Sequence, residues 1–187
     1  MASPARSLTA VRIIAGSKKG SRLFTPKGDT RPTGDRVREA AFNLIGPVDG
    51  AAVLDLFAGS GALGLEALSR GAARAVFVES DPDACRTIKR NLEKLRFTGA
   101  TVLCRDALRA LAAEAAAGRR YDLVLADPPY EMFPSLQTAL TAYLPAVLAE
   151  DGVLVVETAA RVEPELPLAK RMSRRYGSAR LTLFGHA

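Results

Sequence analysis

The feature that most constrains the fold is a regular alternation of short apolar runs and helix-like segments, which begins near residue 51. The apolar runs lie at 52–57, 75–79, 101–104, 122–126 and 153–157, and the segments between them at 61–70, 82–96, 107–117 and 134–149. The runs are almost continuously apolar, as in strands that helices cover on both faces. The intervening segments repeat apolar residues at helical spacing. This order predicts a doubly wound α/β fold with a parallel sheet.

The alternation stops after residue 158, where Pro164 and Pro167 interrupt the chain. Two further strands, 168–175 and 179–184, are expected to form an antiparallel hairpin that turns at Gly177. Five parallel strands followed by such a hairpin differ from a dinucleotide-binding domain, in which both halves are βαβαβ units. We therefore predict a Rossmann-like fold with one seven-stranded, mostly parallel sheet.

The first part of the chain follows a different pattern. Segments 12–15 and 21–25 flank a turn rich in glycine and lysine, which predicts a β-hairpin with a basic tip. A helix is expected next, with Thr33 as its N-cap, because apolar residues recur there at helical spacing. We expect residues 1–46 to form a small basic extension of a main domain, residues 47–187, within one compact unit.

Charge is unevenly distributed along the chain, whose net charge is +6. Residues 1–40 carry nine basic and three acidic side chains, residues 161–187 carry six and two, and the centre between them has a net charge of −4. An acidic body between basic ends favours contact of the ends with a polyanion. The alternative is a generally high arginine content, since 20 of the 26 basic residues are arginine.

Several basic residues near the N-terminus are predicted to contact the phosphates of a nucleic acid. They are Lys18, Lys19, Arg22, Arg31, Arg36 and Arg38. Arg36 and Arg38 are expected to project away from the apolar stripe of the first helix. For any single one of these residues, a solvated surface charge is the simpler interpretation.

The rest of the composition excludes several kinds of chemistry. His186 is the single histidine and is next to the last residue, so catalysis by a histidine base is not expected. Cys85 and Cys104 are too few for a disulfide framework or a zinc site, and we interpret them as small buried apolar residues. No apolar run reaches the roughly 20 residues of a membrane span, and residues 1–10 contain no apolar run long enough for a signal peptide, so we expect none there. We expect a cytoplasmic monomer with no metal ion and no membrane partner.

Gly59, Gly61 and Gly64 form a G-x-G-x-x-G motif where the first strand of the main domain meets its first helix. Glycines at such a turn let the backbone pass close to a ligand, and the helix N-terminus offers unpaired N–H groups. Glu79 lies 20 residues after Gly59, at the end of the second strand, where it can hold the hydroxyls of a ribose. The motif therefore fits two cofactors, NAD and S-adenosylmethionine.

Asp55 distinguishes between the two cofactors. A carboxylate that faces the turn from the first strand repels a pyrophosphate but suits the positively charged methionine end of S-adenosylmethionine. Asp106, just past the third strand, can accept a hydrogen bond from the adenine amine. The alternative is that these acids only cap turns and helices. The predicted cofactor site consists of Asp55, Phe57, Gly59, Gly61, Glu79 and Asp106.

A rigid tetrapeptide, residues 127–130, follows the fourth strand. Its two prolines restrict the backbone, so the Asp127 side chain and the Pro128 carbonyl are held side by side as two hydrogen-bond acceptors. Such a pair matches an exocyclic base amine and favours its pyramidal, nucleophilic form, and Tyr130 can stack on the base. We predict Asp127, Pro128 and Tyr130 as the catalytic residues. The alternative is a rigid turn without chemistry.

Residues 55–61 and 127–130 together resemble the class I amino-methyltransferases. Residues 12–16, 31–39 and 61–71 further resemble the RsmD family, the bacterial 16S ribosomal RNA guanine-N2 methyltransferases. The resemblance extends over nearly the whole chain. It departs at position 34, where this chain has glycine and the family usually has threonine or serine.

The resemblance implies methyl transfer from S-adenosylmethionine to the N2 amine of a guanine in 16S ribosomal RNA, namely guanine 966. The substrate would be the small ribosomal subunit or an assembly intermediate. Residues 47–187 would be the methyltransferase domain, and residues 1–46 an extension that contacts RNA. Three alternatives remain. An adenine-amine DNA methyltransferase shares the tetrapeptide chemistry but needs a target-recognition domain, Asp55 opposes an NAD-dependent oxidoreductase, and the intact tetrapeptide opposes a non-catalytic RNA-binding module.

Overall fold

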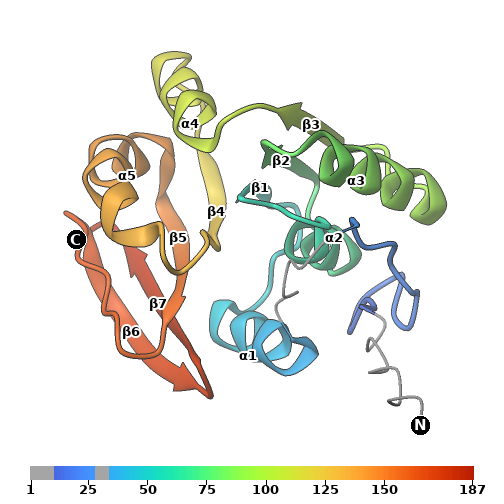
Figure 1. Cartoon of the computed structure of the whole chain (residues 1–187), viewed down its shortest axis with the longest axis horizontal. Helices are drawn as coiled ribbons and strands as arrows, with labels where there is room; N and C mark the ends of the chain where they lie inside the picture. The colour runs from blue at the N-terminus through green and yellow to red at the C-terminus, as the bar shows by residue number, and fades with distance from the viewer. Residues whose placement is uncertain (1–10, 28–33) are drawn as a thin grey trace, which may run out of the picture.

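The computed structural model describes residues 11–27 and 34–187, and in this part of the chain seven strands form one sheet (Figure 1). The strands are β1 (Ala52–Leu56), β2 (Arg74–Glu79), β3 (Ala100–Cys104), β4 (Tyr121–Ala126), β5 (Leu148–Ala159), β6 (Ala169–Tyr176) and β7 (Ala179–Gly185). The helices are α1 (Asp35–Ile45), α2 (Ala62–Ser69), α3 (Pro82–Leu95), α4 (Ala107–Ala116) and α5 (Phe133–Val147). Strands β1 to β5 run parallel and β7 is antiparallel to β5 and β6, which confirms the predicted fold.

The order of strands across the sheet, β3-β2-β1-β4-β5-β7-β6, changes direction at β1. Leu56, the last residue of β1, is in register with Val78 of β2 and Ala126 of β4. The loops that follow these strands therefore meet at one edge of the sheet. In open α/β sheets, ligands bind in the crevice at such a switch point.

Helices cover both faces of the sheet, and the central strands contribute to two cores. Val53 of β1 and Leu125 of β4 pack in a core with α1, α2 and α3, whereas Leu54 and Val124 pack in a core with α4 and α5. All four side chains are buried. Burial on both faces explains why the strands are almost continuously apolar in the sequence.

Helix α3 forms where the sequence predicts it, because its ends are defined locally. Asp81 is the N-cap and accepts a hydrogen bond from the N–H of Asp83 (2.9 Å), and Pro82 occupies the first helical position. Ile88 and Leu92 are buried on its inner face. Its outer face is exposed and carries mainly basic side chains.

The N-terminal segment (residues 11–27) does not form the predicted hairpin of two strands. It makes one isolated antiparallel bridge, between Arg12 and Arg22. The chain still doubles back on itself through backbone hydrogen bonds such as that from the Leu23 N–H to the Val11 carbonyl (2.8 Å). The antiparallel pairing is shorter than predicted because other backbone N–H groups of this segment bond to side chains of α2 and α3.

Glu66 of α2 provides the first of these contacts. Its carboxylate accepts hydrogen bonds from the N–H groups of Ile14 (2.8 Å) and Ala15 (2.9 Å) and from Nε of Arg70 (2.8 Å). The side chain is fully buried. A carboxylate removed from water must be compensated by such bonds.

Two further side chains complete the attachment. Ser69, at the end of α2, accepts a hydrogen bond from the Lys18 N–H through its hydroxyl (2.9 Å). Asn91 of α3 accepts a bond from the Phe24 N–H (2.8 Å) and donates one to the Phe24 carbonyl (3.0 Å). The N-terminal segment is thus bonded to two helices along its length and lies beside them in Figure 1.

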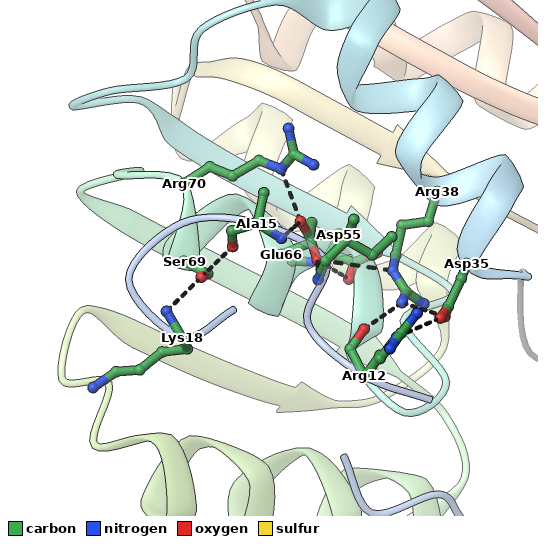
Figure 2. A network of polar contacts seen from close by, with 11 residues as sticks. Arg12, Ala15, Lys18, Asp35, Arg38, Asp55, Glu66, Ser69 and Arg70 are labelled. Carbon is green, nitrogen blue, oxygen red and sulfur yellow. Dashed lines mark hydrogen bonds and ion pairs between the residues drawn. The ribbon is translucent and has the colours of Figure 1, made fainter. Parts of the chain in front are cut away.

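Arg38 of α1 is buried, which corrects the expectation that it projects toward solvent and RNA. Its guanidinium donates to the Asp35 carboxylate (2.9 Å) and the Arg12 carbonyl (2.5 Å), and its Nε lies 3.9 Å from the Glu66 carboxylate (Figure 2). Burial lowers the pKa of Arg38, and the carboxylates of Asp35 and Glu66 raise it. Its charge is therefore compensated inside the protein and is not available to a phosphate.

Further expectations from the sequence concern the N-cap of α1 and the two cysteines. The predicted N-cap Thr33 lies outside the described residues, and Gly34 stands at the N-cap position of α1 without a side-chain hydrogen bond. Cys85 and Cys104 form a disulfide that joins the first turns of α3 to the end of β3. Cys85 is buried as expected but Cys104 is exposed, so the prediction of two buried apolar residues is wrong for Cys104.

We expect Glu66→Ala to lower the free energy of unfolding by about 3–5 kcal/mol, the usual cost of breaking a buried ion pair from one side. The substitution removes the acceptor of two backbone N–H groups and a carboxylate near Arg38. Urea denaturation followed by circular dichroism measures the change. Glu39→Ala, on the exposed surface of α1, is the matched control and should change stability by less than about 0.5 kcal/mol. Equal effects of the two substitutions would contradict the central role of Glu66.

Candidate active site

The turn between β1 and α2 bends sharply because three of its residues adopt positive φ angles. Phe57 has φ 60°, Gly59 56° and Gly61 81°. Left-handed backbone is unusual for a bulky aromatic residue, and such strained positions cluster at ligand-binding sites. The turn is held to β2 by the hydrogen bond from the Ala58 N–H to the Val78 carbonyl (3.0 Å). Gly61 is the N-cap of α2 and has no side chain that could cap the first N–H groups of the helix.

Asp55 lies directly beneath this turn and is almost completely buried. Its Oδ2 accepts a hydrogen bond from the Gly64 N–H in the first turn of α2 (2.9 Å). The pKa of Asp55 is raised to about 7, chiefly by burial; the carboxylates of Asp127 and Glu79 act in the same direction, and the Gly64 hydrogen bond opposes them. A Cβ at position 64 would lie 3.0 Å from Asp55 Oδ2 and would collide with the Phe77 ring, so only glycine lets α2 pack this closely.

Glu79 closes the other side of the turn. Its carboxylate accepts hydrogen bonds from the backbone N–H groups of Gly59 (2.8 Å), Ser80 (2.7 Å) and Asp81 (2.9 Å). These bonds fix its orientation at the end of β2, where the sequence predicts a ribose contact.

Asp106 also lies where the sequence predicts it, after β3, and it acts as the N-cap of α4. Its side chain accepts a hydrogen bond from the Arg109 N–H (2.9 Å). The capping role anticipated as the alternative therefore applies to Asp106. The capping bond uses Oδ1, and a carboxylate has a second oxygen that can accept a further hydrogen bond.

Asp127 follows β4 at the level where the glycine turn follows β1, because Ala126 and Leu56 are in register. It lines a small pocket together with Glu157 of β5. The pocket is lined by Val37, Ala41, Leu63, Leu125, Ala126, Asp127, Val155, Glu157 and Leu181. Helix α1 therefore covers the space beside Asp127, and the residues come from five separate elements and one loop.

Tyr130 is held by a side chain that the sequence analysis did not identify. Its hydroxyl donates a hydrogen bond to Oε1 of Glu157 (2.8 Å), and Glu157 is only 7% exposed. A buried acid at the end of an apolar strand was the available signal, since Glu157 closes the run 153–157. Glu157 thus connects β5 to the predicted catalytic tetrapeptide.

The predicted RNA-contacting residues fall into three groups. Lys19, Arg22 and Arg36 are exposed and Lys18 is half-buried. Arg38 is buried as described above, and Arg31 lies outside the described residues. Lys18 is bonded to Ser69 at the end of α2, the end opposite the glycine turn. The basic tip therefore does not border the Asp127 pocket.

The fold and this edge of the sheet define a class I, S-adenosylmethionine-dependent methyltransferase. The sheet has seven strands, of which the last is antiparallel. The glycine turn after β1 and the tetrapeptide after β4 lie together at the switch point of this sheet. The residues fit the cofactor: a buried carboxylate suits a cationic methionine end, and a fixed carboxylate suits a ribose. Within the described residues, no three or more His, Cys, Asp and Glu side chains gather as metal ligands, and no helix combines the length and apolarity of a bilayer span.

Comparison with known proteins identifies the family. The model described as "Conserved hypothetical protein 95" matches residues 11–185. The chain is 46% identical over 158 residues to "Putative rRNA methyltransferase YlbH" of Bacillus subtilis, which covers 82% of this chain and 85% of that protein. It is 40% identical over 159 residues to "Ribosomal RNA small subunit methyltransferase D" of Escherichia coli K12, covering 84% and 78%.

A solved structure agrees with these relatives. The structure called "Putative methyltransferase yhhF from Escherichia coli" matches with a TM-score of 0.82 and 33% identity, over 95% of this chain and 99% of that one. The chain therefore belongs to the RsmD family, which confirms the resemblance seen in the sequence motifs.

The raised pKa of Asp55 makes stability depend on pH. The unfolded carboxyl ionises near 3.8, whereas the folded one keeps its proton up to about pH 7. Stability from this group is therefore greatest below about pH 4, decreases as the pH rises toward 7, and is constant above 7. Asp55→Asn, which cannot ionise, should become more stable relative to the wild type over this range, by up to about 4 kcal/mol.

Denaturant unfolding of the cofactor-free protein at several pH values from 5 to 8 measures this difference. Asp151→Asn, at an exposed position, is the control and should show no trend relative to the wild type. A difference between Asp55→Asn and the wild type that stays constant with pH would mean that Asp55 ionises normally in the folded protein.

Proposed function

We propose that this protein transfers a methyl group from S-adenosylmethionine to the exocyclic N2 amine of a guanine in 16S ribosomal RNA, namely guanine 966. The substrate is the small ribosomal subunit or an assembly intermediate. One observation carries the proposal: the Asp127 loop and the glycine turn leave neighbouring strands at the same level, since Leu56 and Ala126 are in register. The names of the relatives, which refer to methyltransferases of ribosomal RNA, support the substrate class.

Each residue around the glycine turn binds a different part of the cofactor. Glu79 accepts hydrogen bonds from the ribose hydroxyls, and Asp106 accepts one from the adenine amine. Ionised Asp55 attracts the positively charged methionine end, directly or through water. The backbone at Phe57, Gly59 and Gly61 passes beneath the ligand. When bound, S-adenosylmethionine supplies an electrophilic methyl group on a sulfonium.

The tetrapeptide positions the acceptor. The Asp127 side chain and the Pro128 carbonyl accept the two hydrogens of the guanine N2 amine, which directs its lone pair toward the methyl group. Tyr130 stacks on the base and fixes its plane. The guanine must be unpaired or flipped out, because a duplex occupies its amine in pairing. Alignment of this kind contributes up to roughly 7–11 kcal/mol in well-oriented reactions.

The basic extension, residues 1–46, positions the RNA for the methyltransferase domain, residues 47–187. Lys18, Lys19, Arg22 and Arg36 contact phosphates, which fixes the orientation of the RNA without reading its sequence. Arg31 remains part of this proposal, whereas Arg38 is withdrawn from it because its side chain is buried.

The test of the reaction uses RNA and DNA from cells that lack the gene. Purified protein and labelled S-adenosylmethionine are incubated with naked 16S RNA, with small ribosomal subunits and with duplex DNA, and the methylated nucleosides are identified by mass spectrometry. N2-methylguanine in RNA is expected, and Asp127→Ala should abolish it while cofactor affinity by calorimetry stays near that of the wild type. Methyl-adenine in DNA with none in either RNA would support the DNA methyltransferase instead.

The hydrogen bond between Tyr130 and Glu157 should matter for the reaction. Glu157→Ala removes the acceptor of the Tyr130 hydroxyl, so we expect turnover at saturating substrate to fall by about tenfold, equivalent to about 1.4 kcal/mol. Tyr130→Phe, which lacks the hydroxyl, should have a similar effect, and the double variant no more than either one. Glu157→Gln keeps an acceptor oxygen and should retain most of the activity. Additive losses in the double variant would show that the two side chains act independently.

A further inference from the structure

We propose that the N-terminal segment and helix α3 form a second RNA-binding surface, separate from the methyl-transfer site, that holds backbone phosphates of the ribosomal RNA. This inference rests on the proposed function, because the RNA it binds is the substrate of that reaction. The surface is called the flank and consists of the side chains of Lys18, Lys19, Arg22, Arg90 and Lys94. Lys18 and Lys19 belong to the predicted basic tip and Arg22 to the segment that follows it, whereas Arg90 and Lys94 come from α3.

The two parts of the flank are in direct contact. Phe24 of the N-terminal segment lies against α3, with the Arg90 guanidinium 4.1 Å and the Lys94 ammonium 4.8 Å from the centre of its ring. Lys94 also donates a hydrogen bond to the Arg22 carbonyl (2.6 Å). A cation that stacks on a ring has a fixed position, while the N–H groups at its rim can still bind a phosphate.

The second end of the flank is fixed in the same way. The Lys18 ammonium lies 5.9 Å from the centre of the Phe97 ring, just after α3, and the Lys18 N–H is bonded to Ser69. The N-terminal segment and α3 thus form one surface, although they are about 70 residues apart in sequence. The hydrogen bond between Phe24 and Asn91 is one link between them. Because the protein already holds Lys18, Arg90 and Lys94 in place, binding of RNA to these cations loses little conformational freedom.

The charges of the flank are not neutralised by acidic side chains in the described part of the protein. In the part of the chain that the structure describes, none of the five side chains forms an ion pair with a carboxylate. Other basic residues do: Arg86 pairs with Asp83 and Arg119 with Glu114. Five cations with no acidic partner complement a polyanion, and the phosphates of RNA are the polyanion that the proposed reaction brings to the protein.

The flank extends away from the reaction centre. Near Phe24, Asn91 donates a hydrogen bond to the Ser60 carbonyl in the glycine turn (3.2 Å). At the other end, Lys18 contacts Ser69 in the last turn of α2. The flank therefore runs beside the full length of α2, which is about 12 Å for its eight residues. Contacts there affect how tightly RNA binds, and they do not touch the reacting amine.

The test compares the wild type with Arg90→Gln combined with Lys94→Gln. Affinity for naked 16S RNA and for small subunits is measured at several salt concentrations, together with KM and turnover. At about 0.1 M salt we expect affinity to fall at least about fivefold and the slope of log affinity against log salt to decrease by about 1–2, because up to two phosphate contacts are lost. Turnover at saturating RNA and affinity for S-adenosylmethionine should not change.

Lys89→Gln and Arg90→Gln form the matched pair of controls. Both residues are exposed on α3, but Lys89 is turned about 100° around the helix from Arg90 and so points away from Phe24. Lys89→Gln should change RNA affinity less than about twofold, whereas Arg90→Gln should weaken it and flatten the salt dependence. Thermal unfolding verifies that each variant is folded.

Equal salt slopes for the wild type and the double variant would overturn the flank, as would equal effects of Lys89→Gln and Arg90→Gln. These outcomes are distinct from failure of the proposed reaction, in which the wild type itself methylates neither RNA substrate. The binding measurement does not depend on methyl transfer, so it tests the flank in either case.

Discussion

The buried carboxylate of Glu66 is the interaction on which the arrangement of the N-terminal half depends. It accepts hydrogen bonds from two backbone N–H groups of the N-terminal segment and from Arg70, and it lies near Arg38 of α1 (Figure 2). An isolated charge in this position would be strongly destabilising, so the pieces that surround it must assemble together. The short N-terminal segment therefore gains a defined position without being a strand of the sheet.

A second electrostatic constraint acts at the edge of the sheet where the cofactor is proposed to bind. Burial and the nearby carboxylates of Asp127 and Glu79 raise the pKa of Asp55, so the ligand-free site resists full ionisation. A cationic ligand lowers this cost, whereas a pyrophosphate would increase it. The same crowding of acids thus favours a sulfonium-containing cofactor over NAD, although the glycine motif alone fits both.

The parts of the structure that the sequence predicts well are those determined by local signals. Asp81 and Pro82 define the start of α3 within a few residues, and burial on both faces makes the strands recognisable. The tetrapeptide follows β4 because the prolines cannot continue a central strand. Strand order then brings Asp55, Glu79 and Asp127 to one edge, a consequence of parallel topology that needs no knowledge of side-chain contacts.

Residues whose partners are distant in sequence could not be identified in the same way. Arginine is usually found on the protein surface, so the sequence contains no sign that Arg38 is buried. Its burial becomes possible because Glu66, 28 positions later, lies close to its guanidinium. Glu157 looks like the polar end of a strand until Tyr130 is seen to bond to it. The hairpin was expected from its turn residues, but the side chains of Glu66 and Asn91 bond to other backbone N–H groups of this segment. Each of these errors concerns a tertiary contact that overrides a local preference.

Helix α2 connects the proposed methyl-transfer site with the proposed RNA-binding flank. Close backbone packing immobilises this helix on two sides. At its first turn, Gly64 lies against Asp55 and the Phe77 ring, where a Cβ would collide with the ring. At its last turn, Gly16 lies so close to the Ser69 carbonyl that a side chain on Gly16 would collide with it. Packing this tight leaves little room for the N-terminal segment to shift relative to the glycine turn. RNA bound along the flank would therefore be held in a fixed relation to the methyl donor, so that recognition of the RNA fold can determine which amine reaches Asp127.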